Sequence, residues 1–272
     1  NTYAFSNMIR MFNNQDGGWA SMVPTQNLVD MYEMKSGLRP EEEGSGYDPV
    51  HPFANRDPRL ALTILYPGMD WVGSDGKQRV INTLDKSIDG SLNADYMDAA
   101  DNSSRTGMIW AKYTVPLSQY SASLGNENTC PILFRYAEVL LNYAEAAAEL
   151  ASLGETKYVS DGLTYLNDVR DRAGVEDAPA LTVKAVREEM QVEFMYENHR
   201  FWDLKRWREA DKMMNSVKMK GLYPYYVANT KKWIFKKTEV GNAHDFKPYM
   251  YYIRINDEQI NLNPNIVQNP GY

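Results

Sequence analysis

The sequence predicts a mainly α-helical protein, in which tetratricopeptide-like helical hairpins carry a large, loop-rich, irregular insert with short strands. Two observations lead to this prediction. Residues 131–210 repeat apolar and small side chains at the three- and four-residue spacing of buried helix faces. Residues 1–130 are interrupted by turn signals rich in glycine and proline, and residues 211–272 return to loops. We expect these three regions to form one unit.

Two short elements are expected inside the first loop-rich region. In the segment PTQNLVDMYEMKSG, residues 24–37, Thr25 can cap a short helix and Gly37 can end it. The segment RLALTILY, residues 59–66, is the best strand candidate in the chain. At the other end, residues 251–272 predict a short strand, a turn of helix and a tail rich in proline and asparagine.

The first two helices of region 131–210 predict a helical hairpin. A buried stripe on the first helix is formed by Phe134, Ala137, Leu141, Ala144 and Ala148. The second helix, residues 158–174, places Leu166 and Val169 on one face and stops at Gly174. Two helices within about 40 residues are typical of a tetratricopeptide hairpin. Because a single hairpin cannot bury its own face, it must stack on other helices.

The third helix is expected to begin at a Thr182 cap and to run through EFMYENHRFWDLKRW, residues 193–207. Its buried stripe continues at Val186, Met190 and Phe194. Steps of four, four and three along one helical face connect Glu189, Glu193, Glu197 and Arg200, and Asp203 and Arg206 continue that face. Such spacing favours ion pairing between helices over a pair of catalytic carboxylates. With Trp202 and Trp207 packed against adjoining helices, the stretch is interpreted as a structural seam.

Several classes of site lack support in the sequence. His199 and Asp203 stand four residues apart, but His51 and His244 are the other histidines and no zinc-protease motif surrounds them. Cys130, the single cysteine, lacks a catalytic signature. Residue spacing does not exclude a Ser–His–Asp triad, but no nucleophile elbow supports one. The sequence also has no phosphate-binding glycine loop. A net charge of −7 gives no electrostatic reason for nucleic-acid binding. We expect no enzyme activity, no metal and no cofactor.

Aromatic residues on glycine-flanked loops are the best candidates for a binding surface. Trp19 follows DGG, Tyr47 follows GSG, Trp71 lies between two glycine turns, and Trp110 follows SSRTG. Apolar faces of sugar rings stack on Trp and Tyr, while Asn, Asp and Arg, which are frequent at 93–105, satisfy hydroxyl groups. We expect at least one of the four rings to contact a glycan. The alternative for each is that its ring closes a small apolar cluster beneath its loop.

Six segments follow one another in the order seen in the SusD/RagB family: PTQNLVDMYEMKSG, PFANRDPRL, RYAEVLLNYAEA, LNDVRDRAG, EFMYENHRFWDLKRW and NPNIVQNPGY. Over nearly its whole length the chain thus resembles the glycan-capturing outer-membrane lipoproteins of Bacteroidetes-type bacteria. The resemblance implies a tetratricopeptide-like scaffold at 131–210, a ligand site in region 1–130, and a place on the cell-surface side of the outer membrane. It also implies a partner, a TonB-dependent transporter of the SusC type, over which such proteins sit as a lid during polysaccharide utilization.

Family members carry a signal, a lipidated cysteine and further helical hairpins ahead of the region that begins here at Asn1, so the chain resembles the C-terminal portion of a member. Membrane association is expected only through that lipid anchor, which lies outside this sequence. Residues 134–207 are then expected to expose an apolar face. The family's ligand residues vary, so the resemblance does not assign them. Two functions stay open, oligosaccharide delivery and RagB-like binding of peptide or protein. A grooved, aromatic-lined site favours sugar, whereas an exposed strand edge or a charged pocket favours peptide.

Overall fold

The computed structural model describes residue 14 and residues 18–72, 76–88, 91–97, 102–113, 132–230 and 232–272. Its helices are α1 (Gln26–Val29), α2 (Arg59–Thr63), α3 (Tyr136–Ser152), α4 (Val159–Ala173), α5 (Val183–Glu193), α6 (Arg200–Arg206), α7 (Ala210–Met214) and α8 (Asp257–Leu262), with a 3₁₀ turn at Pro248–Tyr251. The fold is mainly helical with short strands, as the sequence predicts. No helix of the described segments combines the length and the apolar character needed to cross a membrane.

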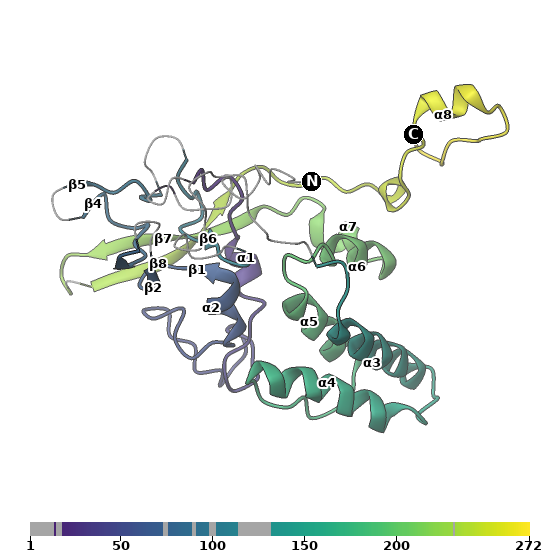
Figure 1. Ribbon diagram of the computed structural model, residues 1–272, viewed down its shortest axis with the longest axis horizontal. Coiled ribbons are helices and arrows are strands. Elements are labelled where there is room, and N and C mark those ends of the chain that lie inside the picture. The colour runs from purple at the N-terminus through teal and green to yellow at the C-terminus, as the bar shows by residue number, and fades with distance from the viewer. Residues whose placement is uncertain are drawn as a thin grey trace.

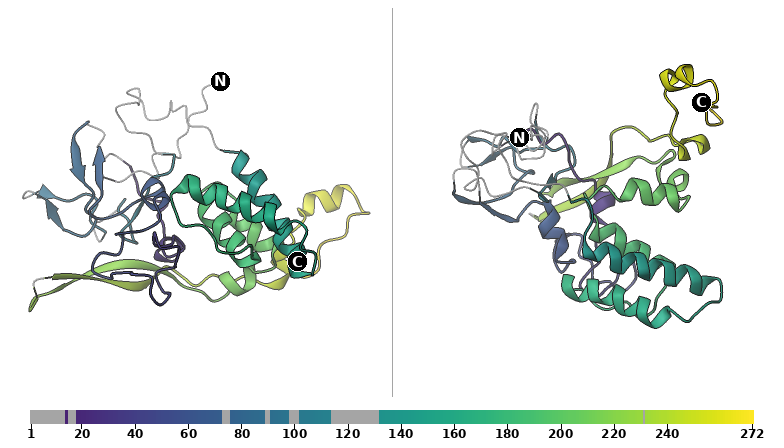
Figure 2. Two further views of the ribbon diagram at one scale, coloured as in Figure 1. Left: turned by 90° about the horizontal axis from the view of Figure 1, so that it is seen from below. Right: turned by 45° about the vertical axis from the view of Figure 1, so that its right-hand side comes forward.

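The strands pair in two-stranded antiparallel sheets. The pairs are β1 (Ile64–Leu65) with β6 (Ile109–Trp110), β2 (Asp70–Val72) with β3 (Gln78–Val80), β4 (Ser87–Ile88) with β5 (Ser91–Leu92), and β7 (Met219–Val227) with β8 (Lys232–Val240). Helices α3, α4 and α5 form a layer on one side, and the strands lie at the opposite end of the molecule (Figure 1). The β7–β8 hairpin extends away from that layer (Figures 1 and 2).

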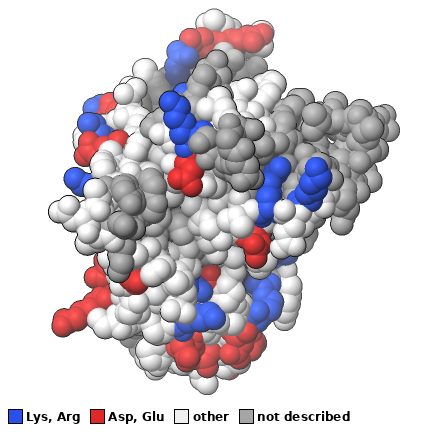
Figure 3. Space-filling view, turned by 90° about the vertical axis from the view of Figure 1, so that its left-hand side faces the viewer, with Lys and Arg blue, Asp and Glu red and all other residues white. Residues whose placement is uncertain are grey.

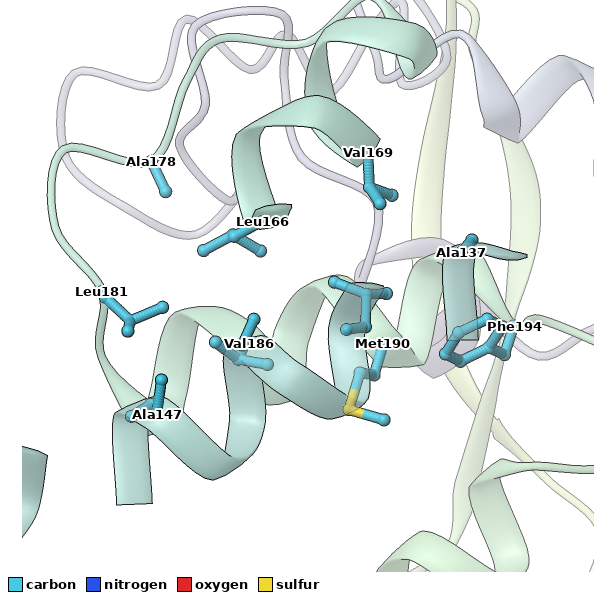
Figure 4. Packing of buried hydrophobic residues seen from close by; sticks show 12 residues of the cluster. Ala137, Ala147, Leu166, Val169, Ala178, Leu181, Val186, Met190 and Phe194 are labelled. Carbon is cyan, nitrogen blue, oxygen red and sulfur yellow. The ribbon is translucent and has the colours of Figure 1, made fainter. Parts of the chain in front are cut away.

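The helical layer encloses an apolar core built from side chains of α3, α4 and α5. Ala147 of α3, Leu166 and Val169 of α4, and Val186 and Met190 of α5 point toward one another (Figure 4). The predicted stripe residues Ala137, Leu141, Ala144, Ala148 and Phe194 belong to the same cluster.

Local signals set the ends of these helices as the sequence predicts. Gly174 caps α4 in the left-handed conformation with φ of 75°, which costs glycine little because it has no Cβ. The Thr182 hydroxyl accepts the N–H of Ala185 at 3.0 Å and so caps α5. Where α3 and α4 meet, a Cβ on Gly162 would lie 2.8 Å from the Cβ of Ala147. The close approach of the two helices therefore requires glycine at 162.

A second core joins parts of the chain that are far apart in sequence. Tyr32, Ile64, Met108, Val192 and Leu222 are among its buried members. Region 1–130, the end of α5 and the β7–β8 hairpin consequently share one apolar cluster. This packing fixes the position of the loop-rich part relative to the helices.

The strand predicted at 59–66 is wrong for most of its length, because residues 59–63 form helix α2 and only 64–65 are extended. The Asp57 carboxylate accepts the N–H of Arg59 at 2.8 Å, and the Thr63 hydroxyl donates to the carbonyl of Arg59 at 2.8 Å. Side-chain hydrogen bonds at both ends thus favour a helical turn over a strand. The helix predicted at 24–37 is also shorter, and it ends at Val29; its Thr25 cap is confirmed, with the N–H of Leu28 donating at 3.3 Å.

The C-terminal region contains more regular structure than the sequence predicts. Residues 211–272 read as loops, yet β7 and β8 pair over nine residues each. Conversely, residues 252–256 are not a strand; a helical turn does follow, as α8. The missed signal is the content of aromatic and β-branched residues in LYPYYV, residues 222–227, and WIF, residues 233–235.

The predicted single helix through 182–207 is broken at 194–199. Tyr196 and Asn198 have φ of 62° and 65°, in the left-handed region that a continuous α-helix cannot contain. The Tyr196 ring stacks on Trp110 at 3.8 Å between centroids, so a long-range aromatic contact accompanies the break. Glu197 and Arg200 therefore do not continue the helical face of Glu189.

Helix α3 presents an apolar outer face. Tyr136, Val139, Tyr143, Leu150 and Leu153 are exposed along it at steps of three, four, seven and three. The expected exposed apolar face in 134–207 is thus confirmed. Phe134, predicted to be buried, is 79% exposed because it precedes the helix, where the extended Arg135 turns its guanidinium inward to Glu193 and Glu197.

Candidate functional site

The four candidate glycan-stacking residues lie in different surroundings. Trp19 is 42% exposed, whereas Trp110 is only 8% exposed. Tyr47 is half-buried, with the guanidinium of Arg56 5.9 Å from the centroid of its ring. Trp71 is half-buried on strand β2. The four residues do not form one continuous platform.

Trp110 does not face solvent as expected. It lies in β6, paired with Ile64 of β1, and its ring is stacked on Tyr196 with an interplanar angle of 16°. A glycine before the residue suggested an open loop, but the short sheet turns the ring inward. This position corresponds to the alternative in which an aromatic ring closes a cluster beneath its loop.

Trp71 lies in the arrangement best suited to a sugar. It sits directly across the β2–β3 hairpin from Arg79, so the two side chains share one face. Beneath them lies a small apolar cluster that includes Leu65, Ile81 and Ile109. Burial lowers the pKa of Arg79, and the negative charge of Asp95 acts in the opposite direction. An aromatic face and a guanidinium thus share one face of the hairpin, and the buried Asp95 is near enough for its charge to act on Arg79.

The backbone that carries Asp95 is fixed by asparagine hydrogen bonds. The Asn93 side-chain oxygen Oδ1 accepts the N–H of Asp95 at 3.0 Å, and the side-chain Nδ2 of Asn93 donates to the carbonyl of Asp85 at 2.9 Å. Thr83 donates to the carbonyl of Gly107 at 2.6 Å and ties the same loop to the segment before β6. We call Trp71, Arg79 and Asp95 the hairpin site. The sequence singled out Trp71 and the segment 93–105, but not Arg79, whose contribution depends on hairpin register.

The stretch EFMYENHRFWDLKRW contributes carboxylates to a buried charged junction between the helical layer and the loop-rich part. We define the charged junction as Asp57, Arg59, Lys112, Arg135, Arg170, Glu189, Glu193 and Glu197. Arg59 binds Asp57, Glu189 and Glu193, and Arg135 binds Glu193 and Glu197. Lys112 reaches Glu197 at 2.5 Å and Arg170 reaches Glu189 at 3.0 Å. The four acids come from two separate parts of the chain, which the junction connects.

Glu193 lies at the centre of the charged junction. Burial alone would raise the pKa of this carboxyl, but hydrogen bonds from Arg135 and Arg172, together with the charges of Arg135 and Arg59, lower it to about 2. The Arg59 guanidinium is also buried, which lowers its pKa, but the charge of Glu189 and the hydrogen bonds that Arg59 donates to Asp57 and Glu189 raise it overall. Groups held so firmly in their charged forms have no capacity to exchange protons near neutral pH.

The remaining residues of the seam lie on or next to α6. Arg206 binds Asp203 at 2.8 Å and Glu145 of α3 at 2.6 Å. The Trp207 indole donates to Glu145, and the ring packs against the helical core. Burial lowers the pKa of Arg200 to about 10, with Asp203 acting against that shift.

Trp202 is 48% exposed and not packed against helices as expected. The reason is the break before α6, which resets the register so that Asp203, Leu204 and Lys205 are buried. Phe201 lies edge-on to Trp202, with centroids 5.2 Å apart, and both rings face outward.

An open, charged cleft separates the loop at 33–42 from the segment joining α4 and α5. Its volume is about 710 Å³, and its walls include Glu33, Arg39, Glu176, Asp177 and Glu188. Arg39 binds Glu188 across it at 3.0 Å. Charges of both signs are also scattered over the strand-bearing end of the molecule (Figure 3). In the described segments, no three His, Cys, Asp or Glu residues form a group able to hold a metal ion; Cys130 lies outside those segments.

The model of the SusD family matches residues 1–272. The chain belongs to the SusD family. A curated SusD-like protein of Bacteroides ovatus is 36% identical over 87 residues, which cover 30% of this chain and 15% of that protein. The helical hairpin and the loop-rich part of this chain therefore both lie within the match to the SusD family.

Solved structures share the fold over nearly the whole chain. A SusD-like protein from Bacteroides fragilis has a TM-score of 0.75 at 22% identity, covering 99% of this chain and 52% of that one. A SusD-like carbohydrate-binding protein from the same species has a TM-score of 0.70 at 26% identity, covering 97% and 53%. The chain therefore spans about half the length of these solved relatives.

Proposed function

We propose that this SusD-family protein binds carbohydrate without altering it and delivers oligosaccharide to a SusC-type TonB-dependent transporter at the outer-membrane surface. Family membership and the carbohydrate-binding relative from Bacteroides fragilis support the first part. The observation that carries the proposal is the hairpin site, where Trp71 offers a partly open ring beside Arg79 and Asp95. Stacking on a sugar face combined with hydrogen bonds to hydroxyl groups is the chemistry such a site performs.

The proposed binding is tested by a glycan-array screen of the full chain, followed by calorimetry with the glycans that bind. Trp71→Ala should weaken binding at least about fivefold, because stacked aromatic contacts contribute about 1–3 kcal/mol. Val72→Ala is the matched control, since Val72 is 42% exposed on the other face of the same strand. Unchanged affinity in Trp71→Ala would remove the hairpin site from the proposal, and the same variants of Trp19 and Tyr47 test those positions.

Two features favour the alternative, RagB-like capture of peptide or protein. The cleft between 33–42 and the α4–α5 segment is lined by charged side chains, and within the described residues strand β8 pairs with β7 alone. Charged pockets and open strand edges suit peptides better than sugars. Calorimetric titration of peptide pools against Arg39→Ala and Trp71→Ala separates the alternatives, because a peptide in the cleft depends on Arg39 and a glycan at the hairpin site on Trp71.

The transporter and the location are tested together. A tagged form of the protein, purified from its native membrane, should carry a TonB-dependent transporter with it, and surface protease should reach the protein in intact cells. Purification without any such transporter would leave glycan binding standing but remove delivery.

A further inference from the structure

The β7–β8 hairpin is unusually basic for this chain. Residues 218–240 contain six lysines (218, 220, 231, 232, 236 and 237) and one acid, Glu239, while the whole chain carries a net charge of −7. The hairpin also extends away from the helical layer (Figure 2). Such a local excess of one sign attracts ligands of the opposite sign, even when the molecule as a whole would repel them.

The inner face of the hairpin is used for packing. Leu222 and Phe235 belong to the second apolar core, and Lys237 binds Asp30 at 2.5 Å. At the base, the N–H of Leu222 donates to the carbonyl of Thr106 at 3.1 Å. A Cβ on Gly221 would lie 3.0 Å from the Cα of Thr106, so the two segments touch backbone to backbone. The hairpin is therefore held in a fixed orientation.

The outer face presents aromatic and basic side chains in register. Tyr223 lies across from Lys236, and Tyr225 lies across from Ile234. Tyr225 is 46% exposed and Ile234 is 44% exposed, so both side chains are open to solvent on this face. The Lys236 ammonium lies 5.9 Å from the centroid of the Tyr225 ring. One open ring thus has a cation beside it.

No carboxylate among the described residues neutralises the charge of Lys236. Lys218 binds Glu239 at 3.1 Å, and Lys237 is committed to Asp30. Among the described residues Lys236 has no carboxylate partner within ion-pair distance. A ligand that supplies both a stacking surface and a negative charge would complete the arrangement. Uronic acid residues do so, because a pyranose ring offers an apolar face and carries a carboxylate at its edge.

We propose that the outer face of the β7–β8 hairpin binds an anionic, uronate-containing polysaccharide. A sugar ring stacks on Tyr225 and its carboxylate pairs with Lys236, while Tyr223, about 7 Å away along the same face, supports the neighbouring part of the chain. The inference rests on the proposed carbohydrate binding and adds the substrate class, at a surface separate from Trp71.

The test is calorimetry of the full chain with polygalacturonate oligosaccharides and with the same oligosaccharides after reduction of their carboxylates to neutral galactose units. The anionic form should bind more tightly, and its affinity should fall as ionic strength rises. Lys236→Gln and Tyr225→Ala should each reduce the affinity about fivefold to tenfold. Lys236→Arg and Tyr225→Phe, which keep the charge and the ring, should retain most of it.

Lys212→Gln on α7 controls for net charge, since this lysine is exposed and pairs locally with Glu209. Equal binding of anionic and neutral oligosaccharides, no binding of polygalacturonate, or insensitivity to both Lys236→Gln and Tyr225→Ala would overturn the inference. If neutral glycans bind through Trp71 in any of those cases, the proposed function still stands. If no glycan binds at all, both fail.

Discussion

The helical layer and the charged junction are two adjacent regions stabilised by opposite kinds of interaction. The core of α3, α4 and α5 is assembled mainly from alanine, leucine and valine side chains of three consecutive helices. In the charged junction, by contrast, Arg59 and Arg135 bring together carboxylates from α5 and from the loops on either side. Apolar contacts favour any close packing, whereas buried ion pairs are stable only in one geometry. The helices thus supply a stable body, and the charges, together with the second apolar core, specify how the loop-rich part sits on it.

The largest effect is expected from Glu193→Ala. The side chain is 2% exposed and holds Arg59 and Arg135, so its removal takes one carboxylate partner from each of two partly buried cations. Loss of one member of a buried ion pair costs about 3–5 kcal/mol. Glu239→Ala, an exposed carboxylate paired with Lys218, should cost below about 0.5 kcal/mol. Chemical denaturation measures both.

Hydrogen exchange shows which region of the molecule Glu193→Ala destabilises. In Glu193→Ala, amides of the second core, around Tyr32 and Met108, should lose more protection than those of α3 and α4. An equal loss of protection in the second core and in α3 and α4 would show that the two regions unfold as one unit. The difference in their interactions would then not give them separate stabilities.

Leu166→Ala should produce the converse pattern. Leu166 is fully buried within the helical core, and truncation of such a residue costs about 2–4 kcal/mol. Protection should fall first in α3 and α4, while the charged junction retains its contacts. Thr164→Ala, exposed on the same helix, is the control and should lie within about 0.5 kcal/mol of the parent. A loss confined to the loop-rich part would contradict the assignment of Leu166 to an independent core.

The helical layer and the charged junction also differ in how well the sequence predicts them. Gly174, Thr182 and the stripe through Leu141 were predictable, because caps and helical periodicity are local signals. The β7–β8 hairpin was missed because Pro224 and scattered lysines weaken the strand pattern, although pairing with Phe235 across the hairpin tolerates the proline. Three of the junction's acids, Glu189, Glu193 and Glu197, were identified, but the cations Arg59 and Arg135 lie far away in sequence, and no local pattern joins them.

In the candidate site, too, local signals were predictable from the sequence and long-range contacts were not. Trp71 could be selected from its glycine turns, whereas its pairing with Arg79 depends on the register of β2 against β3. Trp110 carried the same local signal and proved buried, because Tyr196 covers its ring. A loop signal therefore identifies an aromatic residue that can be exposed, and tertiary packing decides whether it is.

Acid should weaken the charged junction and leave the apolar core intact. The pKa of Glu193 is depressed from 4.5 to about 2 in the folded chain. A carboxyl with a depressed folded pKa stabilises the fold fully above pH 4.5, and that contribution is lost as the pH falls toward 2. Lowering the pH through this window should reduce Tm by an amount equivalent to about 3 kcal/mol. In Glu193→Gln the drop should be smaller, so a calorimetric pH series in which both proteins lose Tm in parallel would contradict the assignment.

The smallest effect is expected where α5 breaks and the chain turns from one region into the other. Asn198 is exposed and adopts φ of 65°, a conformation that asparagine tolerates better than most residues and glycine better still. Asn198→Gly should therefore be neutral or stabilising by less than about 1 kcal/mol, whereas Asn198→Ala should destabilise by about 1 kcal/mol. If the turn instead rebuilt itself as continuous helix, alanine would be the better residue, because it has the higher helix propensity. The order of the two variants in thermal unfolding thus tests whether the stacking of Tyr196 on Trp110 is strong enough to keep the helix broken. The break in the helix must persist for Glu197 to reach Arg135 and Lys112.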